Sequence, residues 1–191
     1  MADRNAGGVA PLAALAIEIA HGRRLSFLRI LWLLFVVEGR PRVLSLIRCS
    51  QHAHLRSHRR LAKWLTRRLQ RQYGCYIQPD SHIGPGLQLP HPQGIVIGSG
   101  VSIGANATIY HQVTLGGARA GDWKAGRYPR LGDGVVLFAG AKLIGAINIG
   151  DGALVGANAV VLADVPAGYR AVGIPARLIL PTSKKSEEHP G

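Results

Sequence analysis

The chain has 191 residues, 47% of them apolar, which is enough for one hydrophobic core with an appendage but not for two independent cores. Its two cysteines, Cys49 and Cys75, have no partner at metal-ligand spacing, which excludes a cysteine zinc site and a disulfide framework and favours a reducing cytoplasm. The net charge of +13 is concentrated in residues 1–75, which carry 14 Lys and Arg against 3 Asp and Glu. This part of the chain is therefore expected to meet an acidic partner, such as a membrane surface, a polyanion or an acidic protein face.

Residues 1–22 are expected to be a weakly ordered lead, and a basic helical region is predicted over residues 23–75. Its apolar stretch from Leu25 to Val37 contains Arg29 and is shorter than the roughly 20 residues that a membrane-spanning helix needs. No small-residue cleavage site follows the stretch, which argues against a cleaved signal peptide. It is therefore predicted to be a buried or interfacial helix.

Pro41 disfavours a continuous helix, so a second helix is predicted from there to about Tyr73. Its apolar residues recur at helical spacing, at Leu55, Leu61, Trp64, Leu65 and Leu69. Basic residues occupy much of the remainder, namely Arg56, Arg59, Arg60, Lys63, Arg67, Arg68 and Arg71. This pattern suits either a solvated face on a packed helix or contact with a membrane or polyanion.

From Ile77 onward the chain has a period of six residues. One position of the period is Ile, Leu or Val in every unit, at Ile83, Leu89, Ile97, Ile103, Ile109, Leu115, Leu131, Leu137, Leu143, Ile149, Val155 and Val161. The next position is often glycine, at Gly84, Gly98, Gly104, Gly116, Gly132, Gly150 and Gly156. A second apolar or small residue follows four positions after the first, as at Val101, Val113 and Ala141.

A six-residue unit cannot bury its apolar side without neighbours above and below it, so three units are predicted to close one triangular coil and the coils to stack. The glycine is expected to supply a corner with permissive dihedral angles and little bulk. The sequence thus predicts a mainly β fold, a parallel β-helix of hexapeptide repeats over residues 76–180, with a flexible tail over 181–191. The abrupt change of period near Ile77 also predicts that residues 1–75 are dispensable for folding of the β-helix.

Two stretches carry a family resemblance: GIVIGSGVSIGANATIYHQVTLGG from Gly94 to Gly117, and IGDGALVGANAVVLADVPAGYRAVGIPA, which ends at Ala176. Over residues 77 to 180 the chain resembles the serine acetyltransferase branch of the hexapeptide acyltransferases. The resemblance implies a left-handed β-helix and an acyltransferase that moves acetyl from acetyl-CoA to a hydroxyl, that of L-serine in cysteine biosynthesis. It also implies a homotrimer, or two paired trimers, in the cytoplasm, with no metal and no nucleic-acid partner.

In that family a His just before the GIVIG strand is the general base, and the matching residue is His91 in Leu89-Pro90-His91-Pro92. The chemistry needs such a group, because an alcohol is a poor nucleophile at neutral pH and an imidazole can take its proton during attack on the thioester. His111 stands where relatives often carry Gln, and we expect it to pack or support rather than to catalyse.

The resemblance also implies a groove for the acyl donor between neighbouring subunits. Its candidates are the small residues Gly116, Gly117, Ala139 and Ala157. Three cations near the closing coils are candidates for the phosphates of CoA, namely Lys142, Arg170 and Arg177. Small residues are also what coil corners require, and solvated surface charge is the alternative for the cations.

The departures from the family pattern concern the acceptor. The Asp that orients the base in the family is Tyr76 here, the Asp directly before the catalytic His is Pro90, and the Arg-His pair of the loop is Arg127-Tyr128. Tyr76 and Arg127 are therefore the candidate acceptor-binding residues. Without the two carboxylates, a hydroxyl of a sugar or surface-polysaccharide precursor becomes an alternative acceptor, and the basic helices would suit an enzyme held at the inner face of the membrane.

Two other classes of protein share this fold. A non-catalytic β-helix scaffold is an alternative because the orienting Asp is missing. A γ-type carbonic anhydrase binds zinc through three histidines, and the sequence from His91 onward lacks the His pair that such a site needs.

Overall fold

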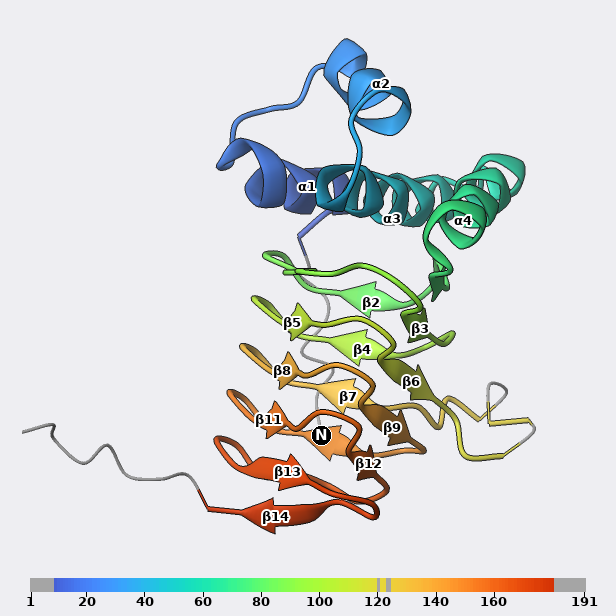
Figure 1. Cartoon of the computed structure of the whole chain (residues 1–191). Helices are drawn as coiled ribbons and strands as arrows, with labels where there is room; N and C mark the ends of the chain where they lie inside the picture. The colour runs from blue at the N-terminus through green and yellow to red at the C-terminus, as the bar shows by residue number, and fades with distance from the viewer. Residues whose placement is uncertain (1–8, 120, 123–124, 181–191) are drawn as a thin grey trace, which may run out of the picture.

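The computed structural model describes residues 9–119, 121–122 and 125–180 of the chain. These residues form a helical cap that covers one end of a triangular prism of short strands (Figure 1). The helices of the cap are α1 (Pro11–Ala20), α2 (Phe27–Phe35), α3 (Arg40–Leu55) and α4 (Arg59–Tyr73).

Helix α1 shows that the prediction of a weakly ordered lead over residues 1–22 was wrong for its second half. The helix starts with Pro11 in its first turn, where the missing N–H of proline costs nothing. It buries Ala14 and Leu15 completely. Residues 1–8 and the predicted flexible tail over 181–191 lie outside the described residues.

The single basic helix predicted to end near Tyr73 is two helices, α3 and α4. A turn at Arg56 to His58 separates them, with Ser57 at a positive φ of 60°. Leu65 and Leu69 of the predicted apolar face pack into the core, whereas Leu55, Leu61 and Trp64 are exposed. Part of the apolar pattern therefore faces away from the core.

The prism consists of three sheets, which we name A, B and C in the order in which the chain enters them. Sheet A contains β1 (Tyr76–Ile77), β3 (Val96–Ile97), β6 (Thr114–Gly116), β9 (Lys142–Ile144) and β12 (Val160–Val161). Sheet B contains β2 (His82–Ile83), β4 (Ser102–Ile103), β7 (Arg130–Leu131) and β10 (Asn148–Ile149). Sheet C contains β5 (Thr108–Ile109), β8 (Val136–Leu137), β11 (Leu154–Val155), β13 (Arg170–Val172) and β14 (Arg177–Ile179).

The six-residue period is confirmed by the register of the strands. Each inward residue pairs with its counterpart in the next coil, as Ile97 does with Leu115 and Leu115 with Leu143. The pairings are parallel apart from the antiparallel closure of β13 with β14. All twelve inward positions of the sequence pattern are at most 9% exposed, so the prism has one continuous core.

The glycines after the inward residues have a different role from the one predicted. A Cβ on Gly84 would lie 2.6 Å from the carbonyl carbon of Gly104, and a Cβ on Gly104 would lie 2.5 Å from that of Gly132. These glycines are therefore needed because stacked coils approach closely. The left-handed corner comes two positions later, as at Gly86 with φ of 78°.

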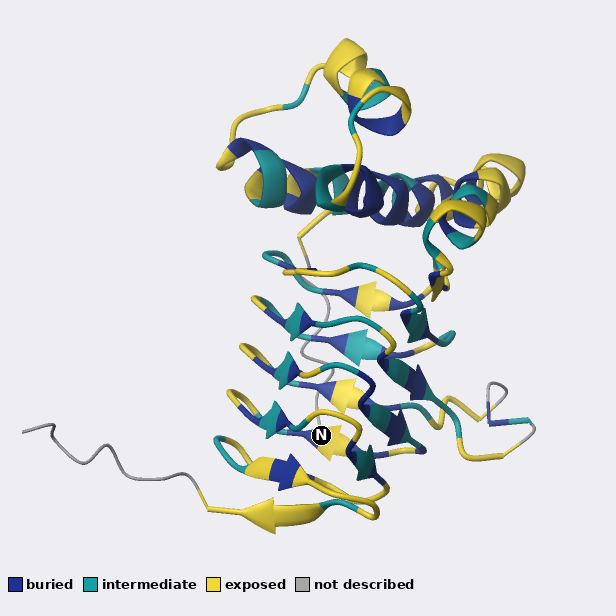
Figure 2. Cartoon of the chain, in the orientation of Figure 1, coloured by how far each residue is buried: buried dark blue, intermediate teal, exposed yellow. Residues whose placement is uncertain are grey.

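A buried ion pair fastens the cap to the first coil. The side chains of Arg48 on α3 and Glu18 on α1 are 1% and 0% exposed and lie 2.5 Å apart. Arg48 also donates to the carbonyl oxygens of Ile83 and Gly84, each at 2.7 Å, and Glu18 accepts the N–H of Leu87 at 3.0 Å. Figure 2 shows α3 buried along most of its length.

The core of the cap is continuous with the core of the prism, which argues against the expectation that residues 1–75 are dispensable for folding. Leu15, Val43, Ile47 and Leu65 belong to the same buried cluster as the inward residues of the coils. Removing the cap would expose the apolar end of the prism and leave backbone groups of the first coil without partners.

We predict that Arg48→Met lowers the free energy of unfolding by about 3–5 kcal/mol, because it leaves the carboxylate of Glu18 buried without its partner. Urea denaturation followed by circular dichroism measures the loss. The double variant Glu18→Leu/Arg48→Met removes both charges and should be more stable than Arg48→Met alone. A single variant as stable as the wild type would contradict the proposed fastening.

Candidate active site

The edge of the prism where sheet C passes into sheet A, here the C–A edge, collects four of the predicted site residues. The N–H of Gly140 donates to the carbonyl of His111, and the N–H of Asn158 donates to that of Ala139. The corners that contain His111, Ala139 and Ala157 therefore stack in successive coils. His91 lies in the corner of the coil before them.

His91 leaves the prism because its corner is two residues longer than the next one. Gln88 pairs with Thr108, and Val96 pairs with Thr114. The step from sheet C to sheet A therefore takes eight residues in the first coil and six in the second. The buried residues on both sides of the corner fix its ends, and the surplus must turn outward. The N–H of Gln93 closes the turn on the carbonyl of His91 at 2.9 Å, and the His91 side chain is exposed.

Two rings lie beside the exposed His91, and aromatic contacts continue along the C–A edge. The His91 ring centroid lies 6.0 Å from that of His111, edge to face, and 6.3 Å from that of Tyr110. Tyr110 in turn stacks on Phe138 of the next coil, with centroids 5.4 Å apart. Among the described residues no ion pair joins His91 to a carboxylate. The imidazole is thus bounded by rings.

The sequence analysis missed Tyr110 and Phe138. Both directly follow an inward residue, the position that glycine fills in seven of the twelve units. A bulky ring at a position that otherwise favours glycine was the available signal. His111, expected to pack or support, lies against His91, and its Nδ1 is buried without a hydrogen-bond partner among the described residues.

Lys142 reaches the same edge from β9. Its Nζ donates to the carbonyl oxygens of Gln112 at 2.7 Å and Gly140 at 2.8 Å. An ammonium group has three N–H donors, so one remains for an anion beside Ala139. Arg170 and Arg177 lie further along, exposed on the antiparallel pair β13 and β14 that closes sheet C.

The opposite edge of sheet A, the A–B edge, carries the loop of residues 117–129 and two predicted donor residues. A Cβ on Gly116 would meet nothing within 4 Å, so space at this residue is open to a ligand. A Cβ on Gly117 would lie 2.8 Å from the Cβ of Asp122. Close packing within the loop therefore explains why this residue is glycine.

Asp122 organises the loop that holds Arg127, and the sequence analysis did not single it out. Its Oδ2 accepts the N–H groups of Ala118 and Arg119, both at 2.8 Å, and its Oδ1 lies 3.1 Å from the Nε of Arg127. The hydrogen bond from Arg119, supported by Ala118 and the charge of Arg127, lowers the pKa of Asp122. It is the one acidic residue between Gly116 and Arg130, and this isolated carboxylate in a loop with two arginines could have pointed to its role.

Tyr128 replaces the family's His and serves as a packing residue. A Cβ on Gly98 would lie 3.1 Å from its ring, and a Cβ on Gly100 would lie 3.2 Å from it. The ring therefore seats the end of the loop on the turn that follows β3. Tyr76, the other departure, is exposed and pairs with Val96 at the start of sheet A.

Most of the predicted residues thus lie on or beside sheet A, at its two edges, whereas Arg170 and Arg177 lie on sheet C. The C–A edge carries His91, Ala139, Ala157 and Lys142, and the A–B edge carries Arg127. The described residues contain no group of three or more His, Cys, Asp or Glu that could hold a metal ion.

The chain is 46% identical to the serine acetyltransferase of Helicobacter pylori strain J99 over 134 residues, which cover 69% of this chain and 77% of that protein. The chain belongs to the serine acetyltransferase family. No protein-family model matches it.

Two solved serine acetyltransferases have the same fold. One, in complex with CoA, has a TM-score of 0.68 and 30% identity, with 89% of this chain and 67% of that chain covered. The Neisseria gonorrhoeae enzyme in complex with serine has a TM-score of 0.66 and 33% identity, with 78% and 65% covered. This serine acetyltransferase homologue thus spans somewhat less than two thirds of the gonococcal chain.

The comparisons confirm the family resemblance, the left-handed β-helix and the assignment to the acyltransferases. They leave the site residues untested, so the roles of His91, Tyr76, Arg127 and the donor residues remain predictions.

We predict that Asp122→Asn opens the loop of residues 117–129 while the prism stays folded. The amide can replace neither the charge that pairs with Arg127 nor both oxygen acceptors of the carboxylate. Hydrogen exchange should show the Ala118 and Arg119 amides losing protection, with that of the coil amides unchanged. Protection in this variant equal to the wild type would contradict the role given to Asp122.

Proposed function

We propose that the protein is an acetyl-CoA-dependent O-acetyltransferase that acts on the hydroxyl of L-serine, with His91 as its general base. The observation that carries this proposal is the exposed imidazole, pushed out of the prism beside an edge lined by Ala139 and Ala157. The relatives' names, and the solved complexes with CoA and with serine, support the same reaction.

In this mechanism His91 accepts the hydroxyl proton while the oxygen attacks the thioester carbonyl. The carbon–sulfur bond then breaks, and the protonated ring can return the proton to the departing thiolate. The products are an acetyl ester and free CoA. The aromatic neighbours Tyr110 and His111 limit the orientations of the ring, which holds it ready for the attack.

The donor is proposed to lie along the C–A edge. Ala139 and Ala157 leave room for the pantetheine arm, and Gly116 leaves open space at the far side of sheet A. Lys142 offers its remaining N–H to a phosphate, with Arg170 and Arg177 near the last coil as further cations.

We propose a homotrimer with sites between subunits. His91 and Arg127 lie at different edges of one chain, so a neighbouring chain packed beside sheet A could bring its own Arg127 to this His91. Two open hollows of the described surface, at the turn between α3 and α4 and along sheet B, do not include His91. The open position of His91 suits a site completed by a neighbour.

A cytoplasmic location, with the basic helices touching the inner face of the membrane, is proposed from the sequence and from the thiols. Cys49 and Cys75 are free, and burial raises the pKa of Cys49 to about 11 and also raises that of Cys75. None of the described helices is long and apolar enough to cross a bilayer.

A sugar hydroxyl is the second candidate acceptor, favoured by Tyr76 and Pro90 at the positions of two family carboxylates. Release of free CoA thiol from acetyl-CoA, measured with L-serine and separately with UDP-sugars and short glycans, tests both. Turnover with serine supports the main proposal. Turnover with a sugar alone overturns the serine assignment, and no turnover with any acceptor favours the non-catalytic scaffold.

We predict that His91→Ala lowers the rate of acetyl transfer by about 10²–10⁴ while leaving CoA affinity nearly unchanged, because the donor is held by other residues. Steady-state kinetics and calorimetry with CoA measure the two effects. His111→Ala is the matched control, since it removes the neighbouring imidazole and should cost much less. Near wild-type turnover in His91→Ala together with an inactive His111→Ala would reverse the assignment of the base.

A further inference from the structure

The outer helices of the cap carry a continuous apolar strip on the protein surface. Leu28, Trp32 and Phe35 occupy one face of α2 at helical spacing and are 76%, 53% and 51% exposed. The Phe35 ring lies 6.2 Å from the ring of Trp64 on α4, and Leu61 lies one turn before Trp64. These five residues, here the cap strip, join the two helices into one exposed surface.

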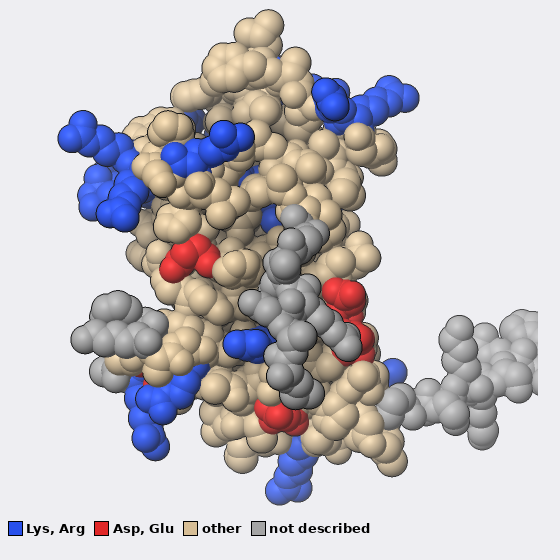
Figure 3. Space-filling view, turned by 180° about the vertical axis from the view of Figure 1, so that it is seen from behind, with Lys and Arg blue, Asp and Glu red and all other residues tan. Residues whose placement is uncertain are grey.

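Arginines surround the cap strip. Arg68 lies over the rings of Phe35 and Trp64, at 4.6 and 5.5 Å from their centroids. The same two helices carry further arginines, namely Arg29 on α2 and Arg60, Arg67 and Arg71 on α4. Within the described part of the chain the ion pairs are Arg48–Glu18 and Arg127–Asp122, so these arginines carry uncompensated charge. Figure 3 shows Lys and Arg on both sides of the uncharged top of the molecule.

We infer that the cap strip docks the protein on an anionic lipid surface. Aromatic rings and leucines enter the boundary between headgroups and acyl chains, and arginines beside them meet the lipid phosphates. The helices lie in the plane of the surface, which agrees with their being too short and too charged to span it. This docking is independent of which acceptor the enzyme uses.

A second copy of the chain is the competing occupant, and the charges disfavour it. Symmetric pairing of two cap strips would bring the same set of arginines against itself, so like charges would repel at the interface. An anionic bilayer neutralises these charges instead. Charge complementarity therefore selects the lipid surface.

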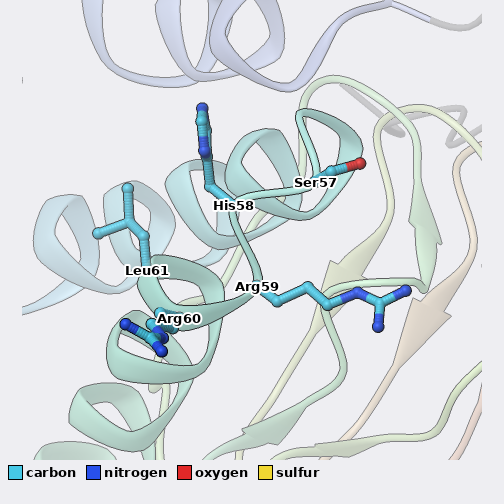
Figure 4. A pocket seen from close by; sticks show the side chains of 5 residues that line it. All are labelled: Ser57, His58, Arg59, Arg60 and Leu61. Atoms are coloured by element: carbon cyan, nitrogen blue, oxygen red, sulfur yellow. The ribbon is translucent and has the colours of Figure 1, made fainter.

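The hollow next to the strip argues for charge attraction rather than for recognition of one headgroup. It lies at the turn between α3 and α4 and is lined by Ser57, His58, Arg59, Arg60 and Leu61. In Figure 4 the side chains of Arg59 and Arg60 point in different directions, and His58 points away from both. They do not converge on one anion, so binding should follow surface charge.

Co-sedimentation of the full chain with vesicles tests the inference. Vesicles of phosphatidylcholine alone are compared with vesicles that also contain about 30 mol% phosphatidylglycerol. We expect binding to the anionic vesicles at least about tenfold tighter than to the neutral ones, and weakened by salt. Equal partition into the two kinds of vesicle would overturn the proposal.

Matched variants locate the docking surface. Trp32→Glu and Leu28→Glu should each weaken partition at least about tenfold, and Arg67→Gln by about fivefold. Leu28→Glu is the safer variant for folding because an acidic residue in the first turn of a helix is favourable. The control is Leu162→Glu, which makes the same change at a 59% exposed leucine of the prism and should bind as the wild type does.

Three further outcomes are decisive. If both strip variants fold by circular dichroism and bind vesicles as tightly as the wild type, the strip is not the docking surface. If Trp32→Glu instead dissociates a larger assembly in sedimentation while the wild type ignores lipid, a second copy is the occupant. Acetyl transfer without vesicles should be unchanged in Leu28→Glu, so a failure of docking and a failure of the proposed reaction are told apart.

Discussion

The hydrogen bonds between stacked coils impose the constraint on which the rest of the structure depends. Each strand donates to and accepts from the strand directly beside it, so a regular coil returns to the same lateral position after three six-residue units, and only the last coil closes with two residues fewer. A coil with extra residues can keep this register only by sending them outward. The chain exceeds the count at two places, the corner that contains His91 and the loop of residues 117–129.

Both excursions border sheet A, and both carry candidate acceptor chemistry. The short one projects His91 by two surplus residues, and the long one carries Arg127, held by Asp122 and seated by Tyr128. The donor candidates behave differently, since Ala139 and Ala157 lie in corners of the regular six-residue length, from Val136 to Lys142 and from Leu154 to Val160. In the proposed site, a regular edge of the prism would hold the donor and the two irregular segments would hold the acceptor.

The six-residue repeat could be predicted from the sequence because inward side chains have the same surroundings in every coil. The same residue types therefore recur at the same position of each unit. Helix α1 was missed because its stability comes from tertiary packing, above all from Glu18 pairing with Arg48, 30 positions away. Periodicity in α4 indicated an amphipathic helix but could not say which apolar residues face the core. Leu65 packs inward, whereas Trp64, its neighbour in sequence, joins the exposed strip.

The candidate site also contains residues that the sequence predicted and residues that it did not. His91 could be placed from its motif and its flanking prolines, and the structure supplies the reason for its exposure, the two-residue excess of its corner. Asp122 escaped prediction because its partners are N–H groups of its own loop, which leave no periodic trace.

The departures from the family pattern fall in the proposed acceptor segments and not along the proposed donor edge. Replacing an acidic residue by Tyr76 or Pro90 changes only segments at or beside the first coil, near the proposed acceptor site, and leaves the stacking of later coils intact. In the proposed mechanism, packing against Tyr110 and His111 would take the role of an orienting carboxylate for His91. Ring contacts restrict the angle of an imidazole but supply no negative charge to its protonated form. A base held in this way is therefore expected to gain its advantage from positioning rather than from charge stabilisation, and acceptor preference can change without disturbing the donor edge.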